Sequence, residues 1–146
     1  MNVPDSGNAL GAAIARRLVD EACSAARQAY APYSNFRVGA AVLGGDGAVY
    51  KGANIENASL GLGTCAERVA LAAAIANGER DIVAIAIACV DASMDSPLAQ
   101  RMPCGACRQW FQELAPQAEI FILGEDRSFR VNDLLPMAFS LKREQD

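Results

Sequence analysis

The stretch TCAERVALAAAIANGERDIVAIAIACV, residues 64–90, sets the framework of the chain. Its first part, residues 65–77, is an alanine-rich run that predicts a helix, and Asn77-Gly78 is a typical helix end. Its second part, residues 81–90, is almost wholly apolar and rich in β-branched residues, which predicts a strand buried on both faces, as in parallel sheets. A helix that leads directly into a buried strand is typical of α/β proteins.

The flanking segments extend this pattern in both directions. Upstream, the spacing of apolar residues and a glycine-rich turn predict a helix at 8–30 with Asn8 as its N-cap, a strand at 36–43, a turn at 44–47 and a strand at 48–53. Downstream, we expect a helix from Pro103 to about Ala115, strands at 119–123 and 128–131, and a helical turn at 132–135. This order predicts a single domain over residues 1–146, with a mixed sheet that carries helices on both faces.

Composition restricts the class of function. The 146 residues are 52% hydrophobic and 21% charged, as expected of an ordinary globular protein. A net charge of −4 argues against electrostatic binding of nucleic acid. The N-terminal residues lack the order of a signal peptide, and no apolar run approaches the roughly 20 residues of a membrane span. We therefore expect a cytoplasmic protein that binds neither nucleic acid nor membrane.

The chain has five cysteines and no histidine. The lack of histidine excludes Ser-His-Asp and Cys-His hydrolases, because their general base is missing. Any transition-metal site must therefore use cysteines and carboxylates. Cys23 and Cys89 lie within a predicted helix and a predicted strand, where buried structural thiols are expected.

The other three cysteines open two predicted helices. Cys65 starts C-A-E, and Cys104 and Cys107 form P-C-G-A-C. Three thiols at two helix starts can hold one Zn²⁺ and leave its fourth position for water, which is the arrangement of a catalytic zinc site. Positive helix ends also favour the thiolate form that a metal requires. Glu67, two residues past a ligand, is then the candidate to carry the protons of that water.

Each charged neighbour of the cysteines also has a plainer interpretation. Glu67 could be a first-turn glutamate favoured by the helix dipole, but the placement of the three cysteines favours the catalytic role. Zinc with three thiolates carries a formal charge of −1, which Arg68 and Arg108 are candidates to offset by donating hydrogen bonds to sulfur. This role is favoured for Arg68, whereas Arg108 is equally well explained as a surface residue.

Two other interpretations of the cysteines explain less of the pattern. A structural zinc site needs a fourth protein ligand, and only Cys23 and Cys89 remain to provide it. A redox C-x-x-C accounts for Cys104 and Cys107 but gives no role to Cys65-Ala66-Glu67.

The sequence resembles the small zinc-dependent cytidine deaminases that form homotetramers, and it fits the zinc-deaminase signature with a Cys₃ ligand set. The segments that carry the resemblance are AYAPYSNFRVGAAV (29–42), GANIENAS (52–59), TCAERVAL (64–71), MPCGACRQ (102–109) and LLPMAF (134–139). The resemblance implies a three-layer α/β/α sandwich around a five-stranded mixed sheet, with one Zn²⁺ per chain. It also implies hydrolysis of cytidine and 2′-deoxycytidine to the uridines and ammonia, a reaction of pyrimidine salvage.

The resemblance further implies a role for each site residue. Cys65, Cys104 and Cys107 would hold zinc, while Glu67 would shuttle protons. Asn54 and Glu56 would hydrogen-bond the ribose hydroxyls, Phe36 would line the base pocket, and the backbone of Ala66 would contact the base edge. Phe139 would complete the pocket, in this family often across a subunit boundary.

The chain departs from the family pattern at three places. Leu60 stands where tyrosine is common, Met102 stands where serine is usual, and the loop 91–102 is longer than typical. These departures bear on the range of substrates. Two alternatives follow: a deaminase of a modified cytosine nucleoside such as blasticidin S, and a non-catalytic, zinc-stabilised binding module. The N-I-E-N motif (54–57) argues against the former because it resembles a ribose-binding pattern.

Overall fold

A computed structural model describes residues 10–143, which form a five-stranded sheet flanked by helices. The strands lie in the order β2-β1-β3-β4-β5. Their bounds are β1 Val38–Gly44, β2 Val49–Ala53, β3 Ile82–Cys89, β4 Glu119–Ile122 and β5 Phe129–Arg130. Only β3 and β4 pair in parallel, and the other neighbours are antiparallel. The predicted mixed sheet is therefore confirmed.

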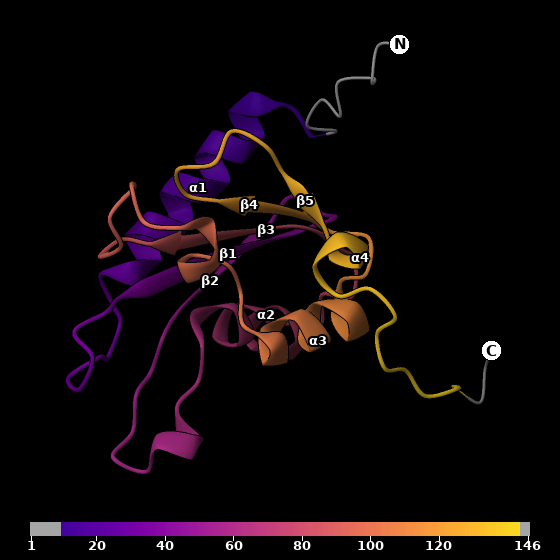
Figure 1. Ribbon diagram of the computed structural model, residues 1–146. Helices are drawn as coiled ribbons and strands as arrows, with labels where there is room; N and C mark the ends of the chain where they lie inside the picture. Colours follow the sequence, from indigo (N-terminus) through magenta and orange to yellow (C-terminus); the bar gives the residue numbers. More distant parts are fainter. Residues whose placement is uncertain (1–9, 144–146) are drawn as a thin grey trace.

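The helices form a layer on each side of this sheet (Figure 1). Helix α1 (Ala12–Ala26) covers one face, whereas α2 (Ala66–Ala76) and α3 (Gly105–Leu114) lie side by side on the other. Shorter elements are the 3₁₀ helices η1 (Leu60–Leu62) and η2 (Leu98–Gln100) and the helical turn α4 (Val131–Leu134). The three-layer α/β/α sandwich is thus observed, and α2 and α3 begin close to one another.

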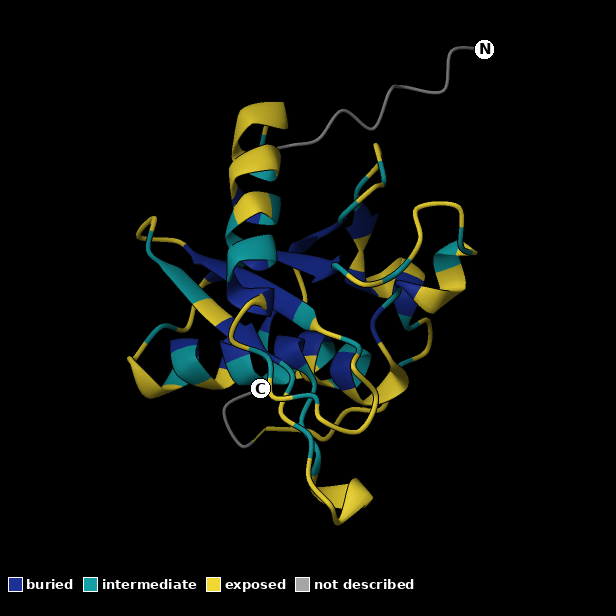
Figure 2. Ribbon diagram, turned by 90° about the vertical axis from the view of Figure 1, so that its left-hand side faces the viewer, coloured by how far each residue is buried: buried dark blue, intermediate teal, exposed yellow. Residues whose placement is uncertain are grey.

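The alternation of side chains along the strands builds a separate apolar cluster on each face. In β1, Ala41 and Leu43 pack with α1, whereas Ala40 and Val42 pack with α2 and α3. The central strands β1 and β3 are accordingly buried along their length except at Val38 and Val83, which are half-buried (Figure 2). β3 is buried on both faces as predicted, although it has a parallel neighbour on one side only.

Two glycines let helices approach the sheet more closely than a side chain would permit. A Cβ atom on Gly39 would lie 1.9 Å from the carbonyl oxygen of Ala22 in α1. A Cβ atom on Gly52 would lie 2.4 Å from the backbone nitrogen of Ala70 in α2. These contacts set the height of α1 and α2 above opposite faces of the sheet, and α2 is the helix that opens with Cys65.

The observed bounds correct several predicted ones. The first helix covers residues 12–26, not 8–30, and its N-cap is Gly11 at φ 81°; Asn8 lies outside the described residues. The first strand starts at Val38, because Asn54 holds the backbone of Phe36 and Val38 with its side chain. Pro103 precedes the N-cap of α3 and so lies outside its first turn. Over residues 10–143, none of the helices has the length and apolar character needed to span a membrane.

Candidate metal centre

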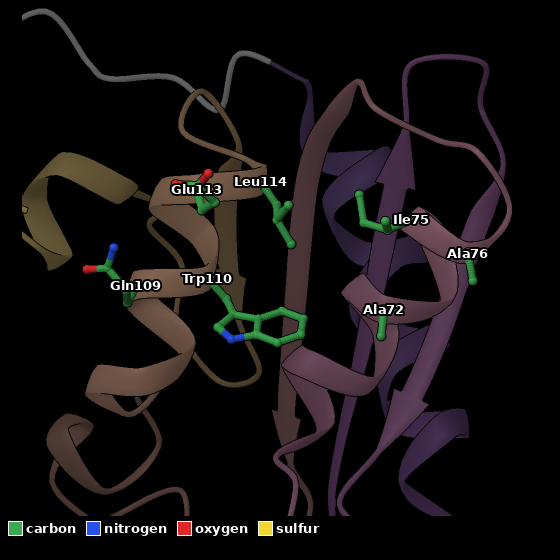
Figure 3. A pocket seen from close by; sticks show the side chains of 7 residues that line it. All are labelled: Ala72, Ile75, Ala76, Gln109, Trp110, Glu113 and Leu114. Atoms are coloured by element: carbon green, nitrogen blue, oxygen red, sulfur yellow. The ribbon is translucent and has the colours of Figure 1, made fainter. Parts of the chain in front are cut away.

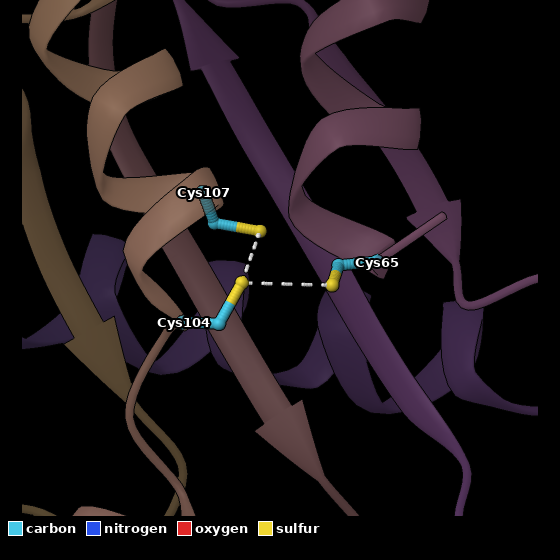
Figure 4. Close-up of side chains that lie close together, drawn as sticks. All are labelled: Cys65, Cys104 and Cys107. Atoms are coloured by element: carbon cyan, nitrogen blue, oxygen red, sulfur yellow. Dashed lines mark hydrogen bonds between the residues drawn. The ribbon is translucent and has the colours of Figure 1, made fainter. Parts of the chain in front are cut away.

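Three thiols converge where α2 and α3 begin (Figure 4). Cys65 is the N-cap residue of α2, Cys104 is the N-cap residue of α3, and Cys107 lies in the first turn of α3. The two N-cap positions differ by one residue from the predicted first-turn positions. The Sγ atoms of Cys65 and Cys104 are 3.8 Å apart, and those of Cys104 and Cys107 are 3.6 Å apart.

This spacing fits a tetrahedral zinc site. Zinc–thiolate bonds of about 2.3 Å place two sulfurs of a tetrahedron about 3.8 Å apart. All three Sγ atoms lie within 4.8 Å of one another, so they can reach one ion together. Within residues 10–143, which include all five cysteines, no fourth histidine, cysteine or carboxylate joins this group. A metal held here keeps one position open for a small molecule.

The two remaining cysteines are not ligands. Cys89 is buried at the end of β3, where desolvation raises the pKa of its thiol to about 11. Its Sγ donates to the carbonyl oxygen of Arg101. Cys23 is half-buried on α1, against the opposite face of the sheet. The predicted core position is therefore confirmed for Cys89, while Cys23 lies at the edge of its cluster.

The hydrogen bonds among the thiols shift their pKa values in opposite directions, so that one of them is readily ionised. Hydrogen bonds from Cys107 and from Arg68 lower the pKa of Cys65 to about 5, although partial burial opposes this shift. The pKa of Cys107 is raised, first by its hydrogen bond to Cys65 and then by burial. Negative charge therefore collects first at Cys65, at the N-terminus of α2, where a helix dipole favours it.

Arg68 is the cation that supports this charge. Its guanidinium donates a hydrogen bond of 3.7 Å to the Sγ of Cys65. Arg108 does not reach a sulfur among its described hydrogen bonds. It donates instead to the carbonyl oxygens of Pro103 and Leu134, at 2.8 Å and 2.7 Å, and thereby fastens the loop before α3 to the end of α4. Of the two interpretations left open for Arg108, the contact with sulfur is therefore not supported by these hydrogen bonds.

Glu67 lies in the first turn of α2 and is only 4% exposed. Burial raises the pKa of its carboxyl group, and the neighbouring Cys65 adds to that effect. A carboxyl group with a raised pKa beside a metal centre is well suited to accept and return protons near neutral pH.

The two aromatic residues predicted to bind a nucleoside lie in different places. Phe36 is half-buried and packs against the apolar cluster that contains Ala66 and Cys107, so these three lie in one region. Phe139 is 69% exposed, and its backbone oxygen accepts a hydrogen bond from Gln109 on the outer part of α3. Phe139 is therefore not part of the cluster around the thiols within this chain.

Asn54 and Glu56 leave β2 beside the metal centre. The residue between them, Ile55, exchanges two backbone hydrogen bonds with Thr64, which precedes Cys65. Glu56 lines a cavity of about 320 Å³, together with Tyr33, Ser34, Asn57, Leu60 and Gly63. Glu56 is predicted to bind the sugar and Leu60 is a departure from the family pattern, and the structure places both in the lining of one cavity.

A second hollow lies on the outer side of the two site helices. The groove between α2 and α3 has a volume of about 620 Å³ and an apolar lining that includes Ile75, Trp110 and Leu114 (Figure 3). None of the three metal-site cysteines lines it. The groove also shares no lining residue with the cavity at Glu56, so the two are distinct.

Three polar contacts around the site were not predicted. Arg37 makes a bidentate ion pair with Asp91, Arg101 pairs with Glu125 while only 5% exposed, and Ser34 hydrogen-bonds Glu56. The partners in each pair are more than 20 residues apart in the sequence. No local spacing signals such contacts; only the path of the chain brings the partners together.

The sheet, its two helix layers and a three-thiol centre with one open position define a zinc-dependent α/β protein. Comparison with known proteins gives the family. Residues 13–123 match the family described as "Cytidine and deoxycytidylate deaminase zinc-binding region". A cytidine deaminase of Halalkalibacterium halodurans is 47% identical over 133 residues, which are 88% of this chain and 96% of that protein.

Solved structures agree with this match. The chain is similar to the crystal structure of cytidine deaminase from Burkholderia pseudomallei, with a TM-score of 0.76, 45% identity, and coverage of 85% of this chain and 98% of that one. It is also similar to cytidine deaminase from Mycobacterium tuberculosis, with a TM-score of 0.73, 38% identity, and coverage of 86% and 97%. The chain belongs to the cytidine and deoxycytidylate deaminase zinc-binding family, and zinc is its metal.

Proposed function

We propose that this protein is a zinc-dependent cytidine deaminase, which hydrolyses cytidine and 2′-deoxycytidine to the uridines and ammonia. The observation that carries the proposal is the meeting of three thiols and the buried carboxyl group of Glu67 at the start of α2 and α3. The names of the similar proteins support cytidine as a substrate.

Each residue of the centre has a part in this reaction. Cys65, Cys104 and Cys107 hold the zinc ion, which when bound supplies the Lewis acidity that makes a water molecule a nucleophile at neutral pH. Glu67 takes a proton from the attacking water and delivers protons to the ring nitrogen and to the departing amine. Arg68 keeps Cys65 in the thiolate form. The reaction consumes one water and releases one ammonia per nucleoside.

The free hydrogen-bonding capacity of Asn54 and Glu56 matches a sugar hydroxyl. One N–H of the Asn54 amide donates to the carbonyl oxygen of Phe36, so its second N–H is available. The carboxylate oxygens of Glu56 accept from residues 33 and 34 and have acceptor capacity left. A sugar hydroxyl group can accept a hydrogen bond from the Asn54 amide or donate one to the Glu56 carboxylate. Phe36 and the backbone of Ala66 would then contact the base.

We also infer a homotetramer, in which Phe139 completes the pocket of a neighbouring subunit. The support is the set of exposed apolar side chains on protruding parts of the described chain, with Leu60 80% exposed and Phe139 69% exposed. Light scattering that returns a monomer at micromolar concentration would contradict this inference. A cytoplasmic location is supported by the free thiols, which a reducing compartment maintains.

The test compares wild type with Glu67→Gln, using the loss of ultraviolet absorbance of cytidine. We expect kcat to fall by about 10²–10⁴-fold in the variant, because general acid–base catalysis is removed, while zinc content stays the same. Equal rates in both proteins would exclude Glu67 as the proton carrier. A wild type that binds zinc but leaves cytidine and deoxycytidine intact would favour a modified cytosine nucleoside such as blasticidin S, since Leu60 lines the cavity at Glu56. If the wild type consumes none of these nucleosides, the protein would instead be a non-catalytic, zinc-stabilised binding module.

A further inference from the structure

We propose that Ser34 is a positioning residue that couples recognition of the sugar to the wall of the base pocket. This inference rests on the proposed function. Its basis is a chain of hydrogen bonds from the backbone of Phe36, through the Ser34 hydroxyl, to the carboxylate of Glu56.

The direction of this chain follows from the chemistry of its ends. The backbone N–H of Phe36 can only donate, and it donates to Ser34 Oγ at 3.0 Å. The carboxylate of Glu56 can only accept, and it accepts the Ser34 hydroxyl proton on Oε2 at 2.5 Å. The single proton of the Ser34 hydroxyl is therefore committed to Glu56, while one of its two lone pairs accepts from the N–H of Phe36.

The other oxygen of Glu56 is held by the same loop. Glu56 Oε1 accepts the backbone N–H groups of Tyr33 and Ser34, at 2.9 Å and 3.1 Å. Because both oxygens are fixed, the carboxylate can present its remaining acceptor capacity in one direction only. Ser34 and Glu56 also line the same cavity, so that direction is accessible to a ligand.

Both backbone polar groups of Phe36 are hydrogen-bonded. Its N–H bonds Ser34, and its carbonyl oxygen accepts from the Asn54 amide at 2.8 Å. The two residues proposed to bind the sugar thus also position the aromatic residue proposed to contact the base. A serine hydroxyl at position 34 completes this link, because an alanine there would leave Glu56 Oε2 free to rotate and the N–H of Phe36 without an acceptor.

The experiment measures kcat/KM for cytidine and for 2′,3′-dideoxycytidine, which lacks the ring hydroxyls of the sugar, in wild type, Ser34→Ala and Ser34→Thr. In Ser34→Ala the ratio of the two values should fall about tenfold, mainly through a higher KM for cytidine, because a correctly held charged hydrogen bond to the sugar is lost. Ser34→Thr retains the hydroxyl and should restore the ratio. Ser59→Ala is the matched control, since Ser59 lies in the neighbouring loop and its side chain makes no capping hydrogen bond to η1.

A second measurement separates positioning from a general effect on the loop. In a Glu56→Ala background, Ser34→Ala should change the ratio no further, because Ser34 affects recognition of the sugar through Glu56, whereas its contact with Phe36 affects both substrates alike. Equal losses on both substrates, or an additive effect in the double variant, would overturn the inference. A wild type that does not turn over cytidine would instead refute the proposed function, so the two failures are distinguishable.

Discussion

At the scale of single residues, the metal centre depends on groups that adjust the charge of the thiols. Arg68 donates to Cys65 Sγ, and Glu67 is buried one position away. Both lie within the first turn of α2, where the helix dipole also favours negative charge. With zinc bound to three thiolates the centre would carry a formal charge of −1, which Arg68 and the two helix ends offset.

Replacing Arg68 should weaken zinc binding. Arg68→Gln removes the cationic donor to Cys65, and loss of such an outer hydrogen bond typically costs about 10–100-fold in metal affinity. Competition with a chromophoric chelator measures the change. Arg16→Gln, on the exposed side of α1, is the control and should retain wild-type affinity. Unchanged affinity in Arg68→Gln would show that the sulfur contact has no role in holding the metal.

The ion pair between Arg37 and Asp91 gives a prediction for acid stability. Hydrogen bonds from the Arg37 side chain and backbone lower the pKa of Asp91 from 3.8 to about 2. Since the folded-state pKa is below the unfolded value, the pair stabilises the fold above about pH 4, and this contribution is lost as the pH falls through about 2.

The melting temperatures of wild type and Asp91→Asn test this sign. Their difference should be constant above about pH 5 and should shrink between about pH 4 and pH 2, where Asp91 becomes protonated in the folded wild type. A difference that grows as the pH falls would mean that the pair is not the source of the stabilisation.

At the scale of elements, the distance between helix and sheet decides where the ligands lie. Gly39 and Gly52 occupy neighbouring strands but face opposite layers, α1 and α2 respectively. Both close approaches are to helix backbone, which cannot move aside as a flexible side chain can.

Replacing each glycine by alanine should lower the stability of the fold in both cases but weaken zinc binding in only one. Gly39→Ala and Gly52→Ala should each lower the free energy of unfolding by about 1–3 kcal/mol, because a helix must shift to admit the new methyl group. Only Gly52→Ala should also weaken zinc binding, since its Cβ would lie 2.7 Å from the carbonyl oxygen of Ala66, next to Cys65. Gly61→Ala, which meets nothing within 4 Å, is the control. Equal loss of zinc affinity in both variants would contradict the assignment of the two layers.

The elements were largely predictable from sequence because local patterns specify them. The continuous apolar run of β3, the cysteines at the helix starts and Asn77-Gly78 are all short-range signals. Helix ends were less predictable, since α1 is shorter than the apolar pattern that predicted it. The partner of Arg108 could not be predicted from local spacing either, because the carbonyl oxygen of Leu134 lies 26 residues away in the sequence. The hydrogen bonds of Ser34, Arg37 and Arg101 depend on chain topology, which no local spacing contains.

At the scale of the whole molecule, one ion would join two helices that otherwise leave a groove between them. Cys65 begins α2, and Cys104 and Cys107 begin α3, while the outer parts of the helices face each other across the groove beside Trp110 (Figure 3). Zinc binds the folded arrangement of thiols, so its binding free energy also stabilises the fold.

The most direct test of the whole account is to titrate metal-free protein with zinc while following deamination of cytidine. We predict that activity rises linearly and saturates at one zinc per chain, with one uridine and one ammonia formed per cytidine consumed. The melting temperature should rise over the same range of zinc. Full cytidine turnover in rigorously metal-free protein, or saturation with zinc but no uridine formed, would contradict the account.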